Sequence, residues 1–230
     1  AGAESMLRRD SRSYMYPPAI LTGGEISHSI NSLFLINDFN LSASLQGNVS
    51  ARLEQTSLND HWQILPRASL TYKMKDFYLS AIAGLYQQLP ENSFLLRNQH
   101  LSAERCWQYI LGAYHEANGK TFRLEVYNKK YHNLATNLNS IYTSDGYGYA
   151  RGIDLFLNDR EVIKNLEYML AYSYNDSKRK YGDYPAEAMP QYATRHNLSL
   201  ALKYWVQPIR STIGITDRYA SGRPYHNPNE

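Results

Sequence analysis

Apolar and polar residues alternate without interruption from Phe39 to Glu54. Because successive side chains of a β-strand point to opposite faces, this period of two predicts one strand with an apolar face and a wet face. At about 3.3 Å per residue the strand would be on the order of 50 Å long, roughly three times the length usual in a soluble sheet. A strand of that length is typical of the wall of a membrane barrel.

The same alternation returns, with more interruptions, in later segments, which are 62–74, 122–127, 166–175 and 197–204. Their polar faces carry charged residues, which a packed soluble core does not accept without partners. No apolar run approaches the roughly 20 residues of a transmembrane helix, so a chain of this kind crosses a membrane only as strands. The mean hydropathy of −0.54 is compatible with such strands, since half of every strand points at water.

Short and long connections alternate along the chain. Tight links are predicted near Asn37-Asp38, Lys75-Asp76, Asn118-Gly119, 158–165 and Gln207-Pro208, and longer polar stretches at 55–61, 88–105, 132–145, 176–192 and after Ser221. Asn-Gly is the dipeptide preferred in a two-residue hairpin turn. The pattern predicts an all-β fold, an antiparallel up-and-down meander of about ten long strands, at approximately 24–36, 39–54, 62–74, 77–88, 106–117, 120–131, 147–157, 166–176, 193–206 and 209–220. In an outer-membrane barrel the short turns face the periplasm and the long loops face the outside of the cell.

Tyrosine dominates the aromatic residues, with 21 Tyr against 6 Phe and 3 Trp in 230 residues. Its apolar ring and its hydroxyl suit the boundary between lipid and water, although a tyrosine-rich soluble sandwich accounts for the composition equally well. The net charge of +3 is too small to favour nucleic acid as a partner. The single cysteine, Cys106, excludes an internal disulfide and a cysteine metal cluster.

Five segments of the chain carry recognisable motifs. They are NQHLSAERCWQYILGAYHE (98–116), GYGYARGIDLFL (146–157), YMLAYSYNDSKRKY (168–181), RHNLSLALKYW (195–205) and RYASGRPY (218–225). These segments resemble the C-terminal half of the barrel of TonB-dependent outer-membrane receptors. Each motif is weak by itself, but their order and spacing also fit this family. The resemblance covers residues 95–225 well and the first part of the chain only by pattern.

The resemblance implies a 22-stranded transmembrane β-barrel in the Gram-negative outer membrane, blocked by an N-terminal plug. Receptors of this kind take up a scarce nutrient and are driven by the inner-membrane TonB energy-coupling complex. We expect residues 1–230 to be a partial barrel that lacks the plug domain and the terminal strands, so that transport belongs to the parent protein. The implied partners are outer-membrane lipid, the TonB complex through the plug, and a small-molecule ligand such as a siderophore or a glycan.

Charged residues on the polar faces of the predicted strands are expected to line the lumen. They are Arg52, Arg67, Arg123, Glu125, Asp154, Lys203 and Arg218. Asp154 lies opposite Ile153 in the alternation and is expected to point inward, near Arg151 or near a base on a neighbouring strand. A structural ion pair in a wet wall is the simpler role for these groups, and a substrate contact is the alternative.

Arginine and aromatic residues of the long loops are the candidate ligand contacts, because they offer contact area and pair with anions. They are Arg97, His100, Tyr142, Tyr181, Tyr184, Arg195, Arg223 and Tyr225. For each of them an ordinary solvated loop residue is the alternative. No catalytic residue, cofactor or metal site is predicted, since the histidines lack the partner at i+2 or i+4 that a site on one strand or helix needs.

Two other functions are compatible with parts of the pattern. An outer-membrane hydrolase on a closed ten-stranded barrel would need a nucleophile or water-activating cluster at the outer rim, for which His132, Asp145 and His196 are the available residues. A soluble β-sandwich adhesin would need the apolar strand faces to meet each other. The receptor remains the leading hypothesis, and the protein is not expected to be an enzyme.

Overall fold

The computed structural model describes residues 2–12, 15–16, 19–20, 24–58 and 62–224. Its main sheet has 11 antiparallel strands, each hydrogen-bonded to the next in the order β1-β4-β5-β6-β7-β8-β9-β10-β11-β12-β13. The strands are β1 (Gly2–Arg12), β4 (Gly24–Asn40), β5 (Leu45–Thr56), β6 (Gln63–Met74), β7 (Phe77–Gln88), β8 (Glu104–Ala117), β9 (Lys120–Leu138), β10 (Ile141–Asp159), β11 (Leu166–Lys180), β12 (His196–Val206) and β13 (Ser211–Ala220). The predicted all-β meander is confirmed, with one strand, β1, that the alternation did not reveal.

Four short elements complete the described chain. β2 (Met15–Tyr16) and β3 (Ala19–Ile20) pair with each other between β1 and β4. Helix α1 (Asn92–Leu95) lies between β7 and β8, and the 3-10 helix η1 (Gln207–Ile209) lies between β12 and β13. Neither helix of the described part is long and apolar enough to cross a membrane.

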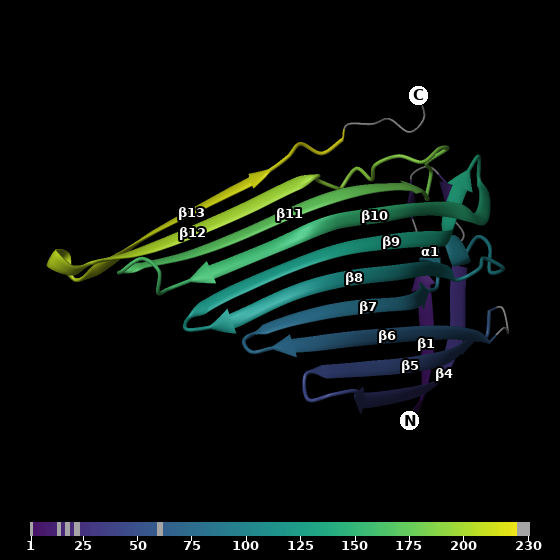
Figure 1. The fold of residues 1–230 in the computed structure, drawn as a ribbon. Coiled ribbons are helices and arrows are strands. Elements are labelled where there is room, and N and C mark those ends of the chain that lie inside the picture. Colours follow the sequence, from purple (N-terminus) through teal and green to yellow (C-terminus); the bar gives the residue numbers. More distant parts are fainter. Residues whose placement is uncertain (1, 13–14, 17–18, 21–23, 59–61, 225–230) are drawn as a thin grey trace.

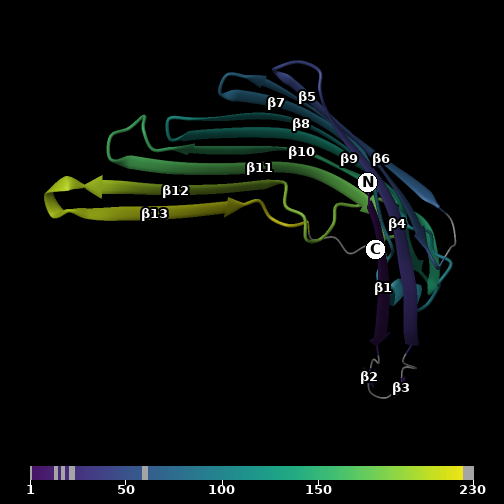
Figure 2. The same ribbon diagram turned by 90° about the horizontal axis from the view of Figure 1, so that it is seen from below.

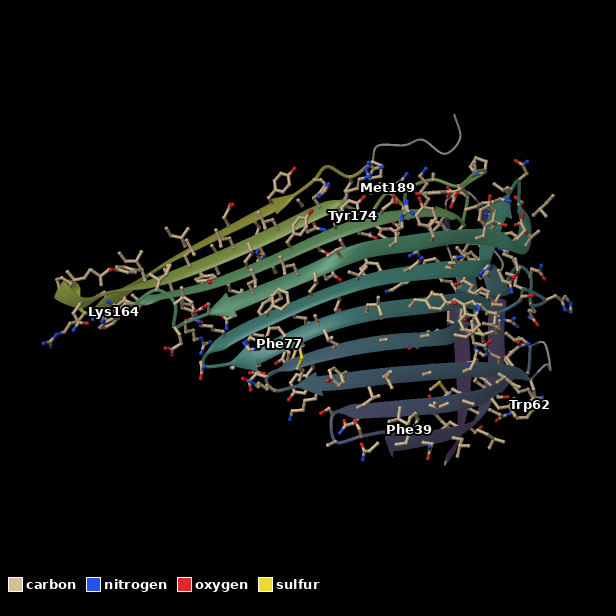
Figure 3. The ribbon with its side chains drawn as sticks, viewed as in Figure 1. Phe39, Trp62, Phe77, Lys164, Tyr174 and Met189 are labelled. Carbon is tan, nitrogen blue, oxygen red and sulfur yellow. The ribbon has the colours of Figure 1, made fainter. Side chains whose placement is uncertain are left out.

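The sheet is strongly curved, so that one face is concave and the other convex (Figures 1 and 2). β1 and β13 form its two edges, and the sheet does not close on itself. The two rims differ. Phe77 and Lys164 lie at the rim of tight turns, whereas Trp62 and Met189 lie at the rim that carries the longer connections (Figure 3).

The hairpin between β4 and β5 corrects the prediction of one strand over residues 39–54. β4 ends at Asn40, and β5 begins at Leu45. Ser42 makes the turn, because its Oγ accepts hydrogen bonds from the backbone N–H groups of Ser44 and Leu45, at 3.2 and 3.1 Å. The four turn residues continue the alternation of the strands, so period two alone does not reveal the turn. The tight link predicted at Asn37-Asp38 is therefore wrong, since these residues lie inside β4 and pair with β5.

The other tight turns are confirmed. β6 and β7 are joined at Lys75 and Asp76, and β8 and β9 at Asn118 and Gly119, whose φ angles are 50° and 68°. Both angles lie in the left-handed region that Asn and Gly tolerate best. The turns β10–β11 and β12–β13 also fall where the sequence predicts them.

Residues 132–145 form a hairpin rather than the predicted long loop. β9 continues to Leu138 and β10 starts at Ile141, and the two strands are joined by Asn139 and Ser140 with φ of 50° and 62°. The sequence hides this extension because polar residues occupy positions on both faces of it, so that the alternation is lost. A register irregularity between Thr143 and Tyr147 adds to the loss.

Replacing Ser140 by glycine is expected to stabilise this hairpin by up to about 1 kcal/mol, because a left-handed conformation is unfavourable for a residue with a Cβ. Hydrogen–deuterium exchange of residues 134–145 in the intact protein should become slower. The matched control is Ser50→Gly inside β5, where extended backbone gains nothing from glycine and exchange should become faster. Faster exchange in the Ser140 variant would contradict the turn described.

The two faces of the sheet follow the alternation. On the convex face large apolar side chains are exposed, including Val49 (50%), Ile64 (65%) and Leu111 (63%). On the concave face Asp154 and Ser173 line a cavity together with Tyr192 of the loop between β11 and β12. Within the described residues no second sheet covers the apolar face, as the soluble sandwich would require. The buried cluster of Ile26, Leu95, Leu101 and Ala135 is small and includes residues from the connection between β7 and β8.

Candidate functional site: a cavity at the long-loop rim

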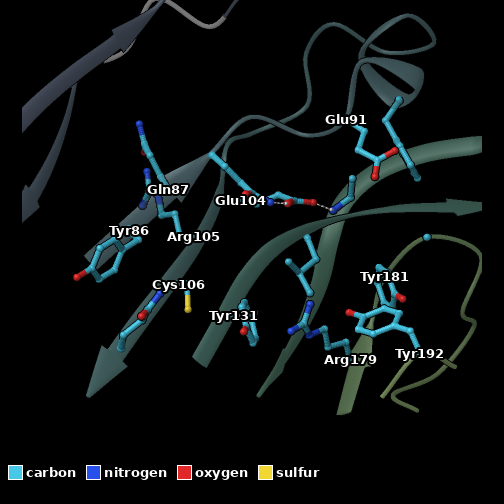
Figure 4. Close-up of a pocket in the computed structure, with 16 residues that line it drawn as sticks. Tyr86, Gln87, Glu91, Glu104, Arg105, Cys106, Tyr131, Arg179, Tyr181 and Tyr192 are labelled. Carbon is cyan, nitrogen blue, oxygen red and sulfur yellow. Dashed lines mark hydrogen bonds between the residues drawn. The ribbon is translucent and has the colours of Figure 1, made fainter. Parts of the chain in front are cut away.

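A cavity of about 480 Å³ opens on the concave face at the rim of long connections (Figure 4). β7, β8, β9 and β11 form its wall, and residues from the connections after β7 and after β11 complete it. Most of the side chains that line it are aromatic or polar. They are Tyr86, Glu91, Phe94, Glu104, Arg105, Cys106, Tyr131, Arg179, Tyr181 and Tyr192.

Strand register explains the centre of the cavity. Gly148 of β10 is paired with Tyr131 on one side and with Arg179 on the other. Because glycine has no side chain, Arg179 reaches across β10, and its guanidinium carbon lies 4.1 Å from the centre of the Tyr131 ring. A Cβ at position 148 would lie 2.8 Å from Cγ of Arg179. Gly148 therefore makes room for this cation–π contact.

Two arginines of the cavity have unused hydrogen-bonding capacity. Within the described residues the Nε atoms of Arg105 and Arg179 are buried without a hydrogen-bond partner. Arg105 also donates to Gln63 Oε1. A buried guanidinium nitrogen without an acceptor is unfavourable, and a ligand with acceptor oxygens would satisfy it.

The acidic residues of the cavity compete little for these arginines. Glu104 accepts hydrogen bonds from Gln88 Nε2 at 2.8 Å and from the backbone N–H of Ala135 at 3.0 Å. Glu91 is exposed on the connection after β7 and interacts with Ser93. The carboxylate of Glu104 thus stabilises the start of β8 against β9, and the arginines stay available.

Three tyrosines close the side of the cavity next to β11. The rings of Tyr181 and Tyr184 lie 5.1 Å apart, and the Tyr184 hydroxyl accepts a hydrogen bond from the backbone N–H of Gln191 at 3.2 Å. Burial, followed by the neighbouring Tyr192 and Tyr184, raises the pKa of Tyr181. Tyr181 therefore stays neutral at physiological pH and keeps a hydroxyl that can donate.

The predicted ligand contacts scatter over the rim. Of the seven that the structure describes, only Tyr181 lines the cavity, and Tyr184 is buried and packs against it. Tyr142 packs edge-on against Phe94, with ring centres 5.8 Å apart. Arg97, His100, Arg195 and Arg223 are exposed, and Tyr225 lies outside the described residues.

The sequence did not point to Arg105, Arg179 or Tyr131 as ligand contacts. Arg105 and Arg179 fall within stretches predicted as long loops, 88–105 and 176–192, but they were not singled out there, and the structure places them on β8 and β11. The available signal was Gly148, since a glycine within a strand marks a place where neighbouring side chains need room.

The predicted lumen residues share one face of the sheet in the observed register. Most have nearby partners: Arg52 with Glu54 (2.9 Å) and Ser32 (2.7 Å), Arg67 with the Tyr86 ring (4.2 Å), Arg123 with Glu125 (2.7 Å), Asp154 with Ser173, and Lys203 with Glu167 (3.7 Å). Arg218 and Arg123 line a second cavity of about 810 Å³ on this face. The expectation that Asp154 lies near Arg151 is wrong. Arg151 points to the opposite face and pairs with Asp176 at 2.9 Å.

The residues considered for a hydrolase do not assemble. His196 is bound to the Tyr172 hydroxyl at 2.9 Å, and Asp145 to Lys180 at 2.7 Å. His132 pairs with Tyr147 of β10. This position is six residues along β10 from Ile153, which lies in the row of His196 with Tyr174 of β11 between them. Among the residues that the structure describes, no group of three His, Cys, Asp or Glu could hold a metal ion.

Replacing Asp145 by asparagine is expected to loosen the β9–β10 hairpin by about 1 kcal/mol, because the ion pair is partly exposed. Hydrogen bonds from Lys180, Thr136 and Thr143 hold the pKa of Asp145 well below its usual range. A carboxyl with a lowered pKa stabilises the folded state above its unfolded pKa, near 4, and loses this effect as the pH falls further. The difference in amide exchange between the Asp145→Asn variant and the unchanged protein should therefore be constant at neutral pH and shrink below about pH 4. Asp183→Asn, on the exposed loop, is the control, and an equal effect there would contradict the anchoring role.

Comparisons with known proteins agree with this architecture. The family model for the TonB dependent receptor-like β-barrel matches residues 6–230. No curated protein matches the chain by sequence. Solved structures with a similar fold include the siderophore receptor PiuA from Acinetobacter baumannii, with a TM-score of 0.68 and 14% identity, covering 88% of this chain and 35% of that one.

Two further structures show the same likeness. The ferric enterobactin receptor PfeA has a TM-score of 0.71 and 13% identity, covering 95% of this chain and 38% of its own. The ferripyoverdine receptor of Pseudomonas aeruginosa, solved with ferripyoverdine bound, has a TM-score of 0.67 and 15% identity, covering 92% and 31%. The chain thus spans about a third of the length of these structures, and at such identities the likeness concerns the fold.

Proposed function

The chain belongs to the TonB-dependent receptor β-barrel family of Gram-negative outer-membrane proteins, and we propose that it forms part of the wall of a nutrient-uptake receptor. Its role is to carry part of the ligand site on the outer rim and to line the passage below it. The observation that carries this proposal is the cavity at the long-loop rim. There Arg105 and Arg179 meet a wall of tyrosines on the concave face.

The chemistry of the cavity favours a compact ligand rich in acceptor oxygens and flat groups. Guanidinium groups pair with anionic oxygens, and tyrosine rings offer broad contact area. Ferric siderophores have both features, and the similar structures are named as receptors for ligands of this kind. A ferric siderophore is therefore the proposed ligand class, and the metal is part of the cargo.

Energy for uptake is proposed to come from the TonB complex, acting through a plug domain of the parent protein. The concave face suits contact with such a plug, because its charged side chains form a polar surface in which most charges are paired with one another. The family is one of receptors and transporters, and no catalytic cluster assembles among the described residues, so a hydrolase is less well supported.

The test is uptake of radiolabelled iron by cells that express the parent receptor, with ferric enterobactin and ferripyoverdine as the first probes. Uptake should appear with at least one ferric siderophore and should vanish in cells without TonB. Uptake that is independent of TonB, or no uptake with a panel of catecholate and hydroxamate chelates, would contradict the proposal.

A further inference from the structure

The convex face changes character along its strands. Leu111, Val126, Ile153 and Tyr174 lie side by side in the register and are part of an apolar band. The next row toward the long-loop rim contains Tyr109, Asn128, Arg151 and Asp176, and the row after it Trp107, Lys130, Tyr149 and Lys178. The band thus ends in two rows that combine aromatic and basic side chains.

The height of this band matches a membrane. Tyr168 pairs with Asp159 at the short-turn end of the band, ten residues along β10 from Tyr149. At about 3.3 Å per residue and a strand tilt of about 40°, this interval rises roughly 25 Å, which is the height of the apolar band of outer-membrane barrels. The row of Lys130, Tyr149 and Lys178 therefore lies at the headgroup level of the outer leaflet.

Most of the charges near this row are already neutralised. Arg151 pairs with Asp176 at 2.9 Å and lies 5.2 Å from the Tyr149 ring, and Lys180 pairs with Asp145 at 2.7 Å. Lys130 and Lys178 are exposed and have no ion pair among the described residues. They flank Tyr149 on its two sides in the register, so their Cα atoms are about 10 Å apart across two strand spacings.

We propose that Lys130 and Lys178, with Tyr149 between them, bind a phosphorylated headgroup of an outer-leaflet glycolipid. Lysines without an ion pair at the edge of an apolar band are placed to attract an anionic group at headgroup level, and a lipid phosphate supplies one. Trp107 and Tyr109, with ring centres 6.3 Å apart on the neighbouring strand β8, offer an apolar platform beside it. The site faces the lipid, so it is separate from the cavity on the concave face and independent of the transported ligand.

The experiment uses the parent receptor, purified in mild detergent and freed of lipid. A fluorescent lipid with a bisphosphorylated disaccharide headgroup is titrated against it, and its dephosphorylated counterpart is titrated in parallel. Lys130→Gln/Lys178→Gln should weaken binding of the phosphorylated lipid by roughly 5-fold for each lysine removed, about 25-fold in all. The dephosphorylated lipid should bind weakly to every variant.

Two controls keep the test specific. Lys130→Arg/Lys178→Arg keeps both charges and should bind like the unchanged receptor. Lys75→Gln/Lys164→Gln removes equal charge from exposed residues at the short-turn rim and should leave binding unchanged. Equal binding by the Lys130→Gln/Lys178→Gln variant, or equal binding of the dephosphorylated lipid, would overturn the proposal.

Discussion

A parent receptor in which Arg105 and Arg179 are both replaced by glutamine is expected to bind its ferric siderophore at least about 30-fold more weakly, which corresponds to about 2 kcal/mol. Each replacement removes charge-assisted hydrogen bonds to ligand oxygens, and the second also removes the contact of Arg179 with the Tyr131 ring. The measurement is equilibrium binding of the ferric siderophore to whole cells, with receptor abundance measured in the same cells.

The matched control for the cavity is Arg195→Ala/Arg223→Ala. This variant also removes two positive charges, but from exposed positions that do not line the cavity. It should weaken binding much less than the cavity pair. A larger loss in the rim pair would place the ligand at the outer rim, as the sequence suggested, and would contradict a site in the cavity.

Replacing Gly152 by valine is expected to prevent most of the receptor from assembling. The Tyr127 ring lies over Gly152, and a Cβ there would be 2.7 Å from the ring carbon Cζ and in collision with the backbone oxygen of Tyr174. A ring can turn away, but the carbonyl of a paired strand cannot move without breaking the ladder. The cost should exceed about 3 kcal/mol, beyond the usual range for overpacking. The amount of folded barrel is measured by heat-modifiable mobility in outer-membrane fractions.

Gly214→Val in β13 is the control for this prediction. A Cβ at position 214 would meet only the oxygen of Leu202, at 3.8 Å, which is ordinary contact. This variant should assemble normally. If both valine variants assembled equally well, the close approach of β9, β10 and β11 at Gly152 would be wrong.

The meander could be predicted from the sequence because each strand and each tight turn is specified by residues that are close together in the chain. Alternation in β6, β11 and β12 and the Asn118-Gly119 turn reflect single strands and single turns, and these predictions are confirmed. The hairpin at Ser42 was not predicted, because its four turn residues continue the alternation of the strands. The extension of β9 and β10 was not predicted for the opposite reason. Polar residues lie on both faces there, so the alternation is absent although a regular hairpin forms.

The cavity was less predictable than the fold. Arg105 and Arg179 are 74 residues apart in the sequence, and only the register of four strands brings them to one cavity. The predicted long stretches 88–105 and 176–192 contain both arginines, but nothing in the local sequence distinguishes them from exposed residues such as Arg97. The face to which each lumen residue points was predictable, because odd and even positions of a strand point to opposite faces. The partner of Asp154 was not, because it depends on which residues the neighbouring strands place beside it.

We expect the rim with the cavity to face the outside of the cell. The most direct test of this orientation is labelling of single cysteines on intact cells with a membrane-impermeant maleimide, in a parent receptor whose Cys106 is replaced by serine. Gln99→Cys and Asp183→Cys lie on the connections of the long-loop rim, and Lys75→Cys and Lys164→Cys lie at the tight turns. The first two should be labelled on intact cells, and the other two only after the outer membrane is permeabilised. Labelling of the tight-turn cysteines on intact cells, with the long-loop cysteines protected, would contradict the account.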